Sequence, residues 1–502
     1  EDVIVDASNY TNGILNAGTS DFKGNLTVTT TNMSNGGINN LSGGNITVAK
    51  DLKVTTLGTT YNSHGVNNAG TIAVTGSTTI NTTTAGSNGI NNTTGTFTSG
   101  GNSTITTKGD GAMGVYTAGG STTFNQLAVN TSGASAIGVY VDAGATSTLG
   151  SGSTVTTTGA GAHGVQVVDG TINYASGDIN TSGVNAHGIV VTNNTASGVQ
   201  LNTGVNVTTT GADSNGVVLL GTDATASNSA TLTGNISATG SYLGIGSSGI
   251  VMNTAGVSSN LTIGGNVTAT TNGVNITASN PTQSDITLTT SAGKTISATA
   301  NAIEASSATG ATTITNAATV ISSAGNGIDV VNATGGSTIN NRGNITATTA
   351  GQFVIAGGNA VETVTTTAGT LTGNINLGLG NDSFTASGGA LVGKTLMGNG
   401  SDVMTVIGAV DLTGATLLDG GDSTDTTVTD ILGTTSAETN KLNFVTTTQS
   451  LAGSVMKNWQ TVTLDKSNVT FINDAALVTG VGTNTDGSLQ GLVLTNASTL
   501  TS

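Results

Sequence analysis

A short step in which glycine is followed by isoleucine or valine recurs along the first two-thirds of the chain and constrains its fold more than any other feature. The glycines of this step are Gly13, Gly37, Gly65, Gly89, Gly114, Gly138, Gly164, Gly188, Gly216, Gly249, Gly273 and Gly327, and Ala302 fills one further position. They are 24 to 33 residues apart. This period is typical of solenoids, in which each turn, or coil, buries its core only against the neighbouring coils.

The residue before the glycine is often asparagine, at Asn12, Asn88, Asn215, Asn272, Asn301 and Asn326. Asparagine and glycine tolerate positive φ, so the pair predicts a tight corner in each coil. Asparagine side chains stacked at such a corner could also form a ladder of hydrogen bonds. A short strand follows the corner, as in Val165-Gln166-Val167-Val168.

A second strand is predicted half a coil later, where asparagine precedes Ile, Leu or Val and then often Thr. This signature occurs at Asn25-Leu26, Asn45-Ile46, Asn235-Ile236, Asn266-Val267, Asn344-Ile345 and Asn374-Ile375. Apolar residues alternate here with threonine, the pattern of a strand with one buried and one solvated face. Helical periodicity is missing. We therefore predict an all-β, right-handed parallel β-helix of about 20 coils, each with two or three short strands.

Composition supports this fold and excludes several functions. Only 7% of the residues are charged, but 35% are apolar and recur in register, so a thin core can form. The net charge is −16 and the ten basic residues do not cluster, which excludes a nucleic-acid partner. No apolar run approaches the length of a transmembrane helix. The chain has no cysteine and starts at Glu1, which we interpret as a processed piece of an exported protein.

Three regions differ in their corners. Regular coils occupy residues 1–370, Gly-Asp corners occupy 371–435, and a C-terminal cap is predicted at 436–502, where Phe444, Trp459 and Phe471 concentrate. The Gly-Asp corners end in Asp382, Asp402 and Asp422. They are similar to the calcium turns of repeats-in-toxin proteins, but occur only once per coil, so these aspartates are weak calcium candidates beside a structural interpretation.

The chain resembles a known family. Leu377–Phe384 reads LGLGNDSF, and Asn458-Trp459-Gln460-Thr461-Val462 forms a terminal strand motif. With the repeated coils, these are similar to the passenger domain of AIDA-type, pertactin-like autotransporter adhesins of Gram-negative bacteria. The resemblance spans the chain mostly as a pattern and is specific only in the last 130 residues or so.

The resemblance implies a protein on the bacterial surface or released from it. It implies binding to host cells, extracellular-matrix proteins or surface glycans, and self-association with identical passengers in aggregates and biofilm. In that family a β-barrel after the passenger provides the only attachment to the outer membrane, and a C-terminal autochaperone region would fall at 436–502. No cofactor and no catalytic residue is expected.

Two residue pairs are candidate binding residues. His163 and His187 occupy the same position in consecutive coils and should stack about 5 Å apart, the spacing of neighbouring strands. Two histidines without a carboxylate fall short of a typical metal site, so polar corner filling is the alternative. Tyr116 and Tyr140 share another position, and outward rings there could contact a glycan or a protein. A cross-strand pair that only stabilises the sheet is the alternative.

Two other functions remain open. A β-helix polysaccharide-processing enzyme would need clustered acids on one outer strand, but Asp110, Asp142, Asp169 and Asp178 are spread over successive turns. A protease is excluded by the lack of any histidine after His187. An ice-binding solenoid would display flat Thr-x-Thr arrays, and segments such as Val155-Thr156-Thr157-Thr158 suggest them. Coils of unequal length argue against a flat array.

Overall fold

The structure is a computed structural model, and it describes residues 1–8, 12–31, 36–58, 62–242, 245–421, 439–472, 477, 479 and 491–501. It is an all-β parallel solenoid of about 16 turns, which confirms the predicted fold class. The number of coils is lower than the 20 expected, because insertions lengthen several coils to 28 residues or more. The chain forms two compact units: unit 1 holds residues 1–253 and 265–270, and unit 2 holds 254–264 and 271–502.

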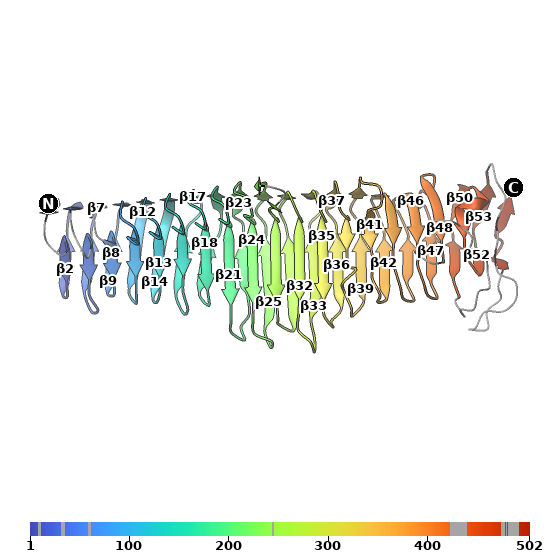
Figure 1. Cartoon of the computed structure of the whole chain (residues 1–502), viewed down its shortest axis with the longest axis horizontal. Helices are drawn as coiled ribbons and strands as arrows, with labels where there is room; N and C mark the ends of the chain where they lie inside the picture. Colours follow the sequence, from blue (N-terminus) through green and yellow to red (C-terminus); the bar gives the residue numbers. More distant parts are fainter. Residues whose placement is uncertain are drawn as a thin grey trace. The chain divides into compact units, whose positions relative to one another are not determined.

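Each coil of unit 1 contributes strands to three parallel columns, which we number in chain order (Figure 1). The first column contains β1 (Val3–Ser8), β4 (Leu26–Thr31), β7 (Leu52–Leu57), β10 (Thr78–Thr82), β12 (Thr96–Thr107), β14 (Ser121–Thr131), β17 (Ser153–Thr157), β20 (Gly177–Thr181), β23 (Asn206–Thr209), β26 (Ile236–Ala238) and β31 (Val267–Ala269). The second contains β2 (Ile14–Asn16), β5 (Ile38–Asn40), β8 (Val66–Asn68), β11 (Ile90–Asn92), β13 (Val115–Thr117), β15 (Val139–Val141), β18 (Val165–Val168), β21 (Ile189–Asn193), β24 (Val217–Gly221) and β29 (Ile250–Thr254). The third contains β3 (Thr19–Phe22), β6 (Asn45–Val48), β9 (Thr71–Val74), the N-terminal parts of β12 and β14, β16 (Thr146–Leu149), β19 (Thr171–Tyr174), β22 (Gln200–Thr203) and β25 (Ser227–Leu232). One antiparallel pair, β27 (Ser241–Tyr242) and β28 (Ile245–Gly246), interrupts the coils.

Unit 2 repeats the three columns. The first contains β34 (Thr295–Ala298), β37 (Thr319–Ser322), β40 (Ile345–Ala347), β43 (Thr370–Thr372) and the start of β46 (Ala390–Leu396). The second contains β32 (Val274–Ala278), β35 (Ile303–Ser307), β38 (Ile328–Asp329), β41 (Phe353–Ala356), β44 (Asn374–Asn376), the end of β46, β48 (Ala415–Asp419) and β51 (Met456–Lys457). The third contains β30 (Ser258–Ile263), β33 (Asp285–Thr290), β36 (Thr312–Asn316), β39 (Ser337–Asn341), β42 (Glu362–Thr366), β45 (Ser383–Ala386), β47 (Val403–Ile407), β49 (Lys441–Val445), β52 (Thr461–Asp465) and β54 (Gly491–Thr495). Near the C-terminus, β50 (Thr448–Leu451), β53 (Asn468–Phe471) and β55 (Thr499–Thr501) pair separately, and the one helix described is a 3₁₀ turn at Gly453–Val455.

The strand after the corner is where the sequence predicts it, but the second signature does not mark one column. Asn25-Leu26 begins a first-column strand, Asn45-Ile46 lies in the third column, and Asn374-Ile375 lies in the second. All three columns need an inward aliphatic residue beside a polar turn, so the same residues serve each of them. The sequence therefore reveals the coil but not the number of columns within it.

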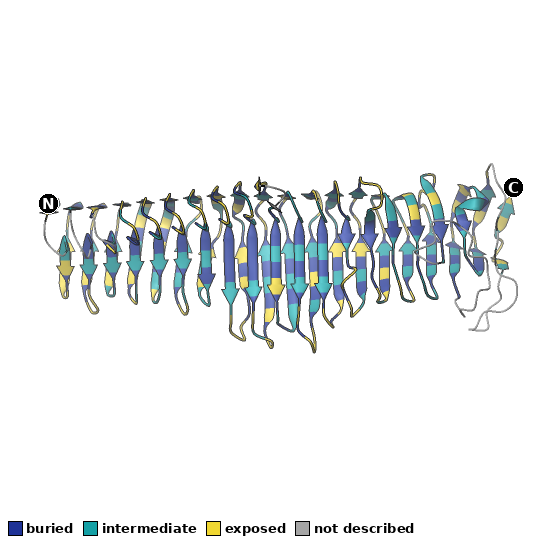
Figure 2. Cartoon of the chain, in the orientation of Figure 1, coloured by how far each residue is buried: buried dark blue, intermediate teal, exposed yellow. Residues whose placement is uncertain are grey.

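Alternation along each strand builds the core, and it gives the striped burial pattern of Figure 2. In β4, Leu26, Val28 and Thr30 are buried while the intervening threonines are partly exposed. The buried threonines are structural, because the last inward residue of several first-column strands donates its hydroxyl to a carbonyl oxygen five residues later. Thr107, Thr131, Thr157 and Thr181 make this bond at 2.5–2.6 Å. In the runs Thr29–Thr31, Thr156–Thr158 and Thr208–Thr210 the middle threonine is thus inside the solenoid.

The corner glycine is required by close packing rather than by positive φ, which corrects the expectation from the sequence. Neither these glycines nor the asparagines before them have positive φ. A Cβ on Gly138 would instead overlap the side chain of Val155 and lie 2.5 Å from the carbonyl oxygen of Gly164 in the next coil. Positive φ occurs three residues earlier, where Gly111, Ser135 and Gly161 occupy equivalent positions.

We predict that Gly138→Ala lowers the free energy of unfolding of unit 1 by about 1–3 kcal/mol, because the added methyl group overpacks two coils at once. Gly18→Ala is the matched control, since a Cβ there would have no atom within 4 Å. Urea denaturation of the two variants compares them directly. Equal midpoints for both variants and the native chain would contradict the close-packing explanation.

Candidate functional site

The residues before the corner glycines form a column in unit 1, which we call the corner column. Where this residue is His64, Asn88, His163, His187 or Asn215, its side chain accepts the backbone N–H of the equivalent residue in the next coil. Asn88 Oδ1 accepts from Met113 at 2.9 Å, and Asn215 Oδ1 accepts from Ser248 at 2.8 Å. Corner asparagines of consecutive coils are bonded to one another in unit 2, where Asn272 Oδ1 accepts the N–H of Asn301 and Asn301 Oδ1 accepts the N–H of Asn326, so the bonds of the predicted ladder join a side chain to a backbone N–H.

His163 and His187 belong to the corner column and take the place of asparagine. Their rings stack as expected, with centroids 4.9 Å apart and planes 6° apart. The Nδ1 of His163 accepts the N–H of His187 at 3.1 Å, and the Nδ1 of His187 accepts the N–H of Asn215 at 3.0 Å. Because Nδ1 accepts, the neutral ring carries its proton on Nε2. Burial lowers the pKa of His163 to about 4 and also lowers that of His187.

The same geometry recurs at His64, whose Nδ1 accepts the N–H of Asn88 at 3.0 Å and whose pKa burial lowers to about 4. The three histidines are therefore held neutral as acceptors within the column. This contact explains their placement without a ligand, while a binding role for His163 and His187 stays a prediction.

Tyr116 and Tyr140 lie side by side on the outward face of the second column. Their ring centroids are 5.3 Å apart and the planes are tilted by 46°. Tyr116 donates its hydroxyl to Asp142 at 3.3 Å, and burial together with this carboxylate raises the pKa of both tyrosines. Both rings are partly exposed. They continue an outward row of amides in which Asn67 and Asn91 are linked at 2.8 Å, so this row offers aromatic and amide groups together.

The aspartates considered for catalysis have structural hydrogen bonds. Asp110 accepts the N–H of Ala134 at 2.8 Å, Asp169 accepts the N–H of Asn194 at 2.6 Å, and Asp178 accepts from the amide of Asn206 at 3.0 Å. Each of these bonds joins consecutive coils. These contacts give Asp110, Asp169 and Asp178 a structural role between coils.

The Gly-Asp corners form a buried column of carboxyl groups in unit 2. Asp382 accepts the N–H of Glu362, and Asp402 accepts the N–H of Asp382, both at 2.7 Å. All three side chains are buried, so they face the interior of the coil. Burial raises the pKa of Glu362 to about 8 and that of Asp382 to about 7.

These contacts give Asp382 and Asp402 a structural role and leave their calcium role a prediction. Asp422 lies outside the described residues. Among the side chains that the structure describes, no group of three or more His, Asp or Glu could hold a metal ion.

A site that the sequence did not reveal lies on the outward face of β32, β35 and β38 in unit 2. Glu304 and Asp329 are paired on neighbouring strands. The Nδ2 of Asn272 donates to Glu304 at 2.7 Å, and that of Asn326 donates to Asp329 at 2.7 Å. The Nδ2 of Asn301 lies between the carboxylates, at 3.2 Å and 3.1 Å. The asparagine corners and the two acids therefore form one outward polar network.

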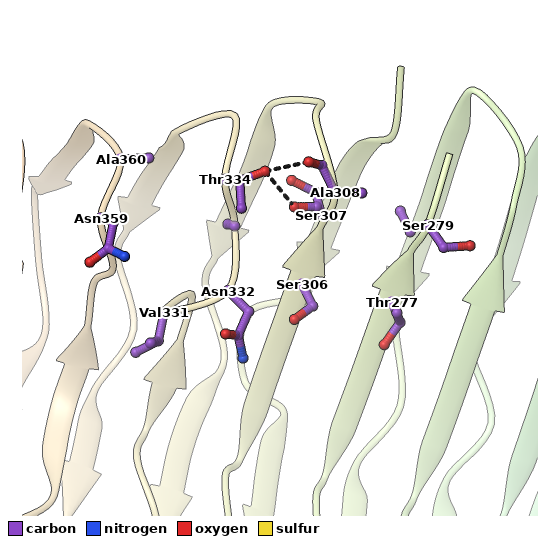
Figure 3. Close-up of a pocket in the computed structure, with 12 residues that line it drawn as sticks. Thr277, Ser279, Ser306, Ser307, Ala308, Val331, Asn332, Thr334, Asn359 and Ala360 are labelled. Carbon is purple, nitrogen blue, oxygen red and sulfur yellow. Dashed lines mark hydrogen bonds between the residues drawn. The ribbon is translucent and has the colours of Figure 1, made fainter. Parts of the chain in front are cut away.

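An open hollow of about 430 Å³ lies on the same strands, two residues further along (Figure 3). Thr277 and Ser306 are paired in its floor, and Val331 is the corresponding residue of the next coil. The sequence indicates this hollow only weakly, because its lining residues are ordinary outward residues of the repeat. Only the register shows that Thr277 and Ser306, 29 positions apart, are neighbours.

The comparisons with known proteins give no family for this chain. A scan against protein-family models finds no match, and neither the curated proteins nor the solved structures provide a similar one. Within the described part of the chain, no helix is both long and apolar enough to cross a membrane.

Proposed function

We propose that the chain is the passenger of an autotransporter adhesin, displayed on or released from a bacterial surface, and that it acts by distributed contact along its solenoid. Its partners are host matrix proteins or glycans and identical passengers on other cells. The parallel β-solenoid is consistent with such a passenger, and the resemblance of Leu377–Phe384 and Asn458–Val462 to that family supports the proposal.

One observation supports the proposal most directly: the outward face of the first column in unit 1 carries one continuous row of neutral polar side chains. From Leu26 to Thr209 the first-column strands pair without a register shift. Eight successive coils place threonine or asparagine at one outward position, which we call the Thr/Asn row. Its members are Thr29, Thr55, Asn81, Thr106, Asn130, Thr156, Asn180 and Thr208.

Such a row suits weak contacts that add up. A hydroxyl or amide hydrogen bond contributes about 1 kcal/mol net, so one coil binds little by itself. Many coils in register, and many passengers on one cell, raise the apparent affinity through multivalency. Tyr116 and Tyr140 add an aromatic platform on the neighbouring second column.

Surface display tests this function. The chain is expressed on a non-clumping Gram-negative bacterium, and sedimentation and adhesion to immobilised matrix proteins are measured. We expect both to increase, and to fall strongly when Thr55, Thr106 and Thr156 are all changed to lysine. The matched control changes Thr47, Thr98 and Thr148 to lysine on the outward face of the third column. A display strain that neither clumps nor adheres would refute the proposed function.

The same register favours ice binding as a second candidate. The Thr-x-Thr pairs Thr27/Thr29, Thr104/Thr106 and Thr154/Thr156 face outward on in-register strands, so unequal coil length does not disrupt the array. Lys53 and Asp178 interrupt it, which argues for adhesion instead. Thermal hysteresis of the purified chain, reduced by Thr104→Lys, would establish this function in place of adhesion.

A further inference from the structure

The hollow is lined by Thr277, Ser306 and Val331, and in the next coil Asn359 and Ala360 also line it. The two residues before Asn359 are Gly357 and Gly358. A Cβ on Gly358 would overlap the carbonyl oxygen of Val331, and one on Gly357 would overlap that of Leu377. Backbone stacking therefore prevents any side chain from filling this end of the hollow.

Three polar side chains of the hollow are free to bind a ligand. Ser306, Asn332 and Asn359 make no side-chain hydrogen bond to another described residue, and both asparagines are exposed. Others in the lining are already engaged. Thr334 donates to Ser307, for example, as Figure 3 shows. The free groups are one hydroxyl and two amides, which both donate and accept hydrogen bonds.

The apolar part of the lining is small and aliphatic. Val331 is 46% exposed beside the free hydroxyl and amides. No charged side chain lines the hollow. A ligand that fits must be neutral, must carry hydroxyl or amide groups at short intervals, and must offer a methyl-sized apolar group. The floor crosses successive strands, about 4.8 Å apart, so an extended ligand would meet one coil after another.

We propose that this hollow binds a short segment of a neutral glycan rich in N-acetylhexosamine. Asn332, Asn359 and Ser306 hydrogen-bond its hydroxyl and acetamido groups, and Val331 contacts an acetyl methyl group. This glycan-binding site, which we call the glycan seat, rests on the proposed adhesive function. It makes that function more specific, because it names one class of ligand and one binding site.

Binding to purified chain tests the site. Chitotetraose is titrated into the full chain by isothermal calorimetry, and saturable binding to one site is expected. The double variant Asn332→Ala/Asn359→Ala should weaken binding by on the order of tenfold or more, because each lost hydrogen bond costs a few-fold. Ser306→Trp should abolish it by filling the hollow. A sulfated heparin tetrasaccharide should not bind, since no cation faces the site.

Asn340→Ala is the matched control, because Asn340 is also an exposed asparagine of unit 2 but lies on β39, outside the hollow. It should bind chitotetraose like the native chain. Equal weakening by Asn340→Ala, or no effect of Ser306→Trp, would place the glycan elsewhere and overturn the proposal.

Adhesion measured in parallel separates the two proposals. If displayed chain adheres to matrix while purified chain binds no chitotetraose, the glycan seat is wrong and the adhesive function stands. If purified chain binds chitotetraose through Ser306 but displayed cells neither adhere nor clump, the seat is correct and the adhesive function is wrong.

Discussion

Trp459→Ala is expected to lower the free energy of unfolding of unit 2 by about 3–5 kcal/mol, the range for removing a fully buried aromatic side chain. Trp459 is 0% exposed, and its indole N–H donates to the carbonyl oxygen of Leu418 at 2.9 Å. Gly420 makes room for the ring, because a Cβ there would lie 2.7 Å from Cε3. The side chain therefore fills the core and satisfies a carbonyl from an earlier coil.

Urea denaturation followed by circular dichroism measures this loss, since the variant lacks the only tryptophan. Trp459→Phe separates the two contributions: it keeps most of the apolar volume and should cost ~1–3 kcal/mol for the lost hydrogen bond and the smaller ring. Leu379→Ala is the control, because Leu379 belongs to the same unit but is 41% exposed. If Trp459→Ala unfolds at the same urea concentration as Leu379→Ala, Trp459 does not anchor the last coils.

The coil could be predicted from sequence because its signals are local. The glycine step marks the start of the second-column strands from β2 to β38, with Ala302 in its place once, and alternation at segments such as Leu26–Thr31 marks inward residues. A shared position in the repeat also placed His163 beside His187 and Tyr116 beside Tyr140. In a solenoid, residues at the same position of consecutive coils are neighbours in space. Such pairs can therefore be predicted directly from the sequence.

What the sequence could not show depends on packing between coils. The reason for glycine at Gly138 is an atom of the next coil and not its own φ. Half of the threonines in a run such as Thr156-Thr157 are inside, and only the register distinguishes them. At Val331, which lines the hollow of unit 2, the backbone of Gly358 stacks closely, a contact between residues 27 positions apart. No pattern within a short segment of sequence predicts this contact between coils.

Raising the pH from 5 to 8 is expected to stabilise unit 1 and destabilise unit 2. In unit 1, His64, His163 and His187 accept backbone N–H groups only when neutral. The pKa of His64 and of His163 falls from 6.5 to about 4 on folding. Their stabilisation is complete above pH 6.5 and is lost as the pH falls towards 4, because the unfolded chain takes up the protons first.

Unit 2 has the opposite dependence. Burial raises the pKa of Glu362 from 4.5 to about 8 and that of Asp382 from 3.8 to about 7, and the nearby Asp382 carboxylate contributes to the rise at Glu362. The folded state therefore holds these protons more tightly than the unfolded state. Stability is greatest below pH 4 and is lost as the pH rises through the folded-state pKa values of these two groups towards 8.

Neutral residues already present in the two columns indicate which substitutions should reduce the pH dependence of each unit. Asn440 and Gln460 continue the column of Glu362, Asp382 and Asp402, and each accepts a backbone N–H as Asp382 and Asp402 do. Glu362→Gln with Asp382→Asn should therefore fold, keep the ladder and lose the pH dependence of unit 2. His163→Asn with His187→Asn should reduce the pH dependence of unit 1 to the share that comes from His64, since Asn88 and Asn215 already occupy that column.

Each unit can be followed by its own signal. Trp459, the single tryptophan, reports unfolding of unit 2 by fluorescence, and hydrogen exchange at the amides of His187 and Asn215, corrected for intrinsic rates, reports unit 1. Opposite slopes between pH 5 and 8 in the native chain, each flattened only by its own pair of substitutions, are the expected result. A unit 2 that still loses stability with rising pH after Glu362→Gln and Asp382→Asn would show that its dependence arises outside the buried acids. The exposed Asp411 cannot be that source, because its pKa is lowered from 3.8 and it titrates below this window.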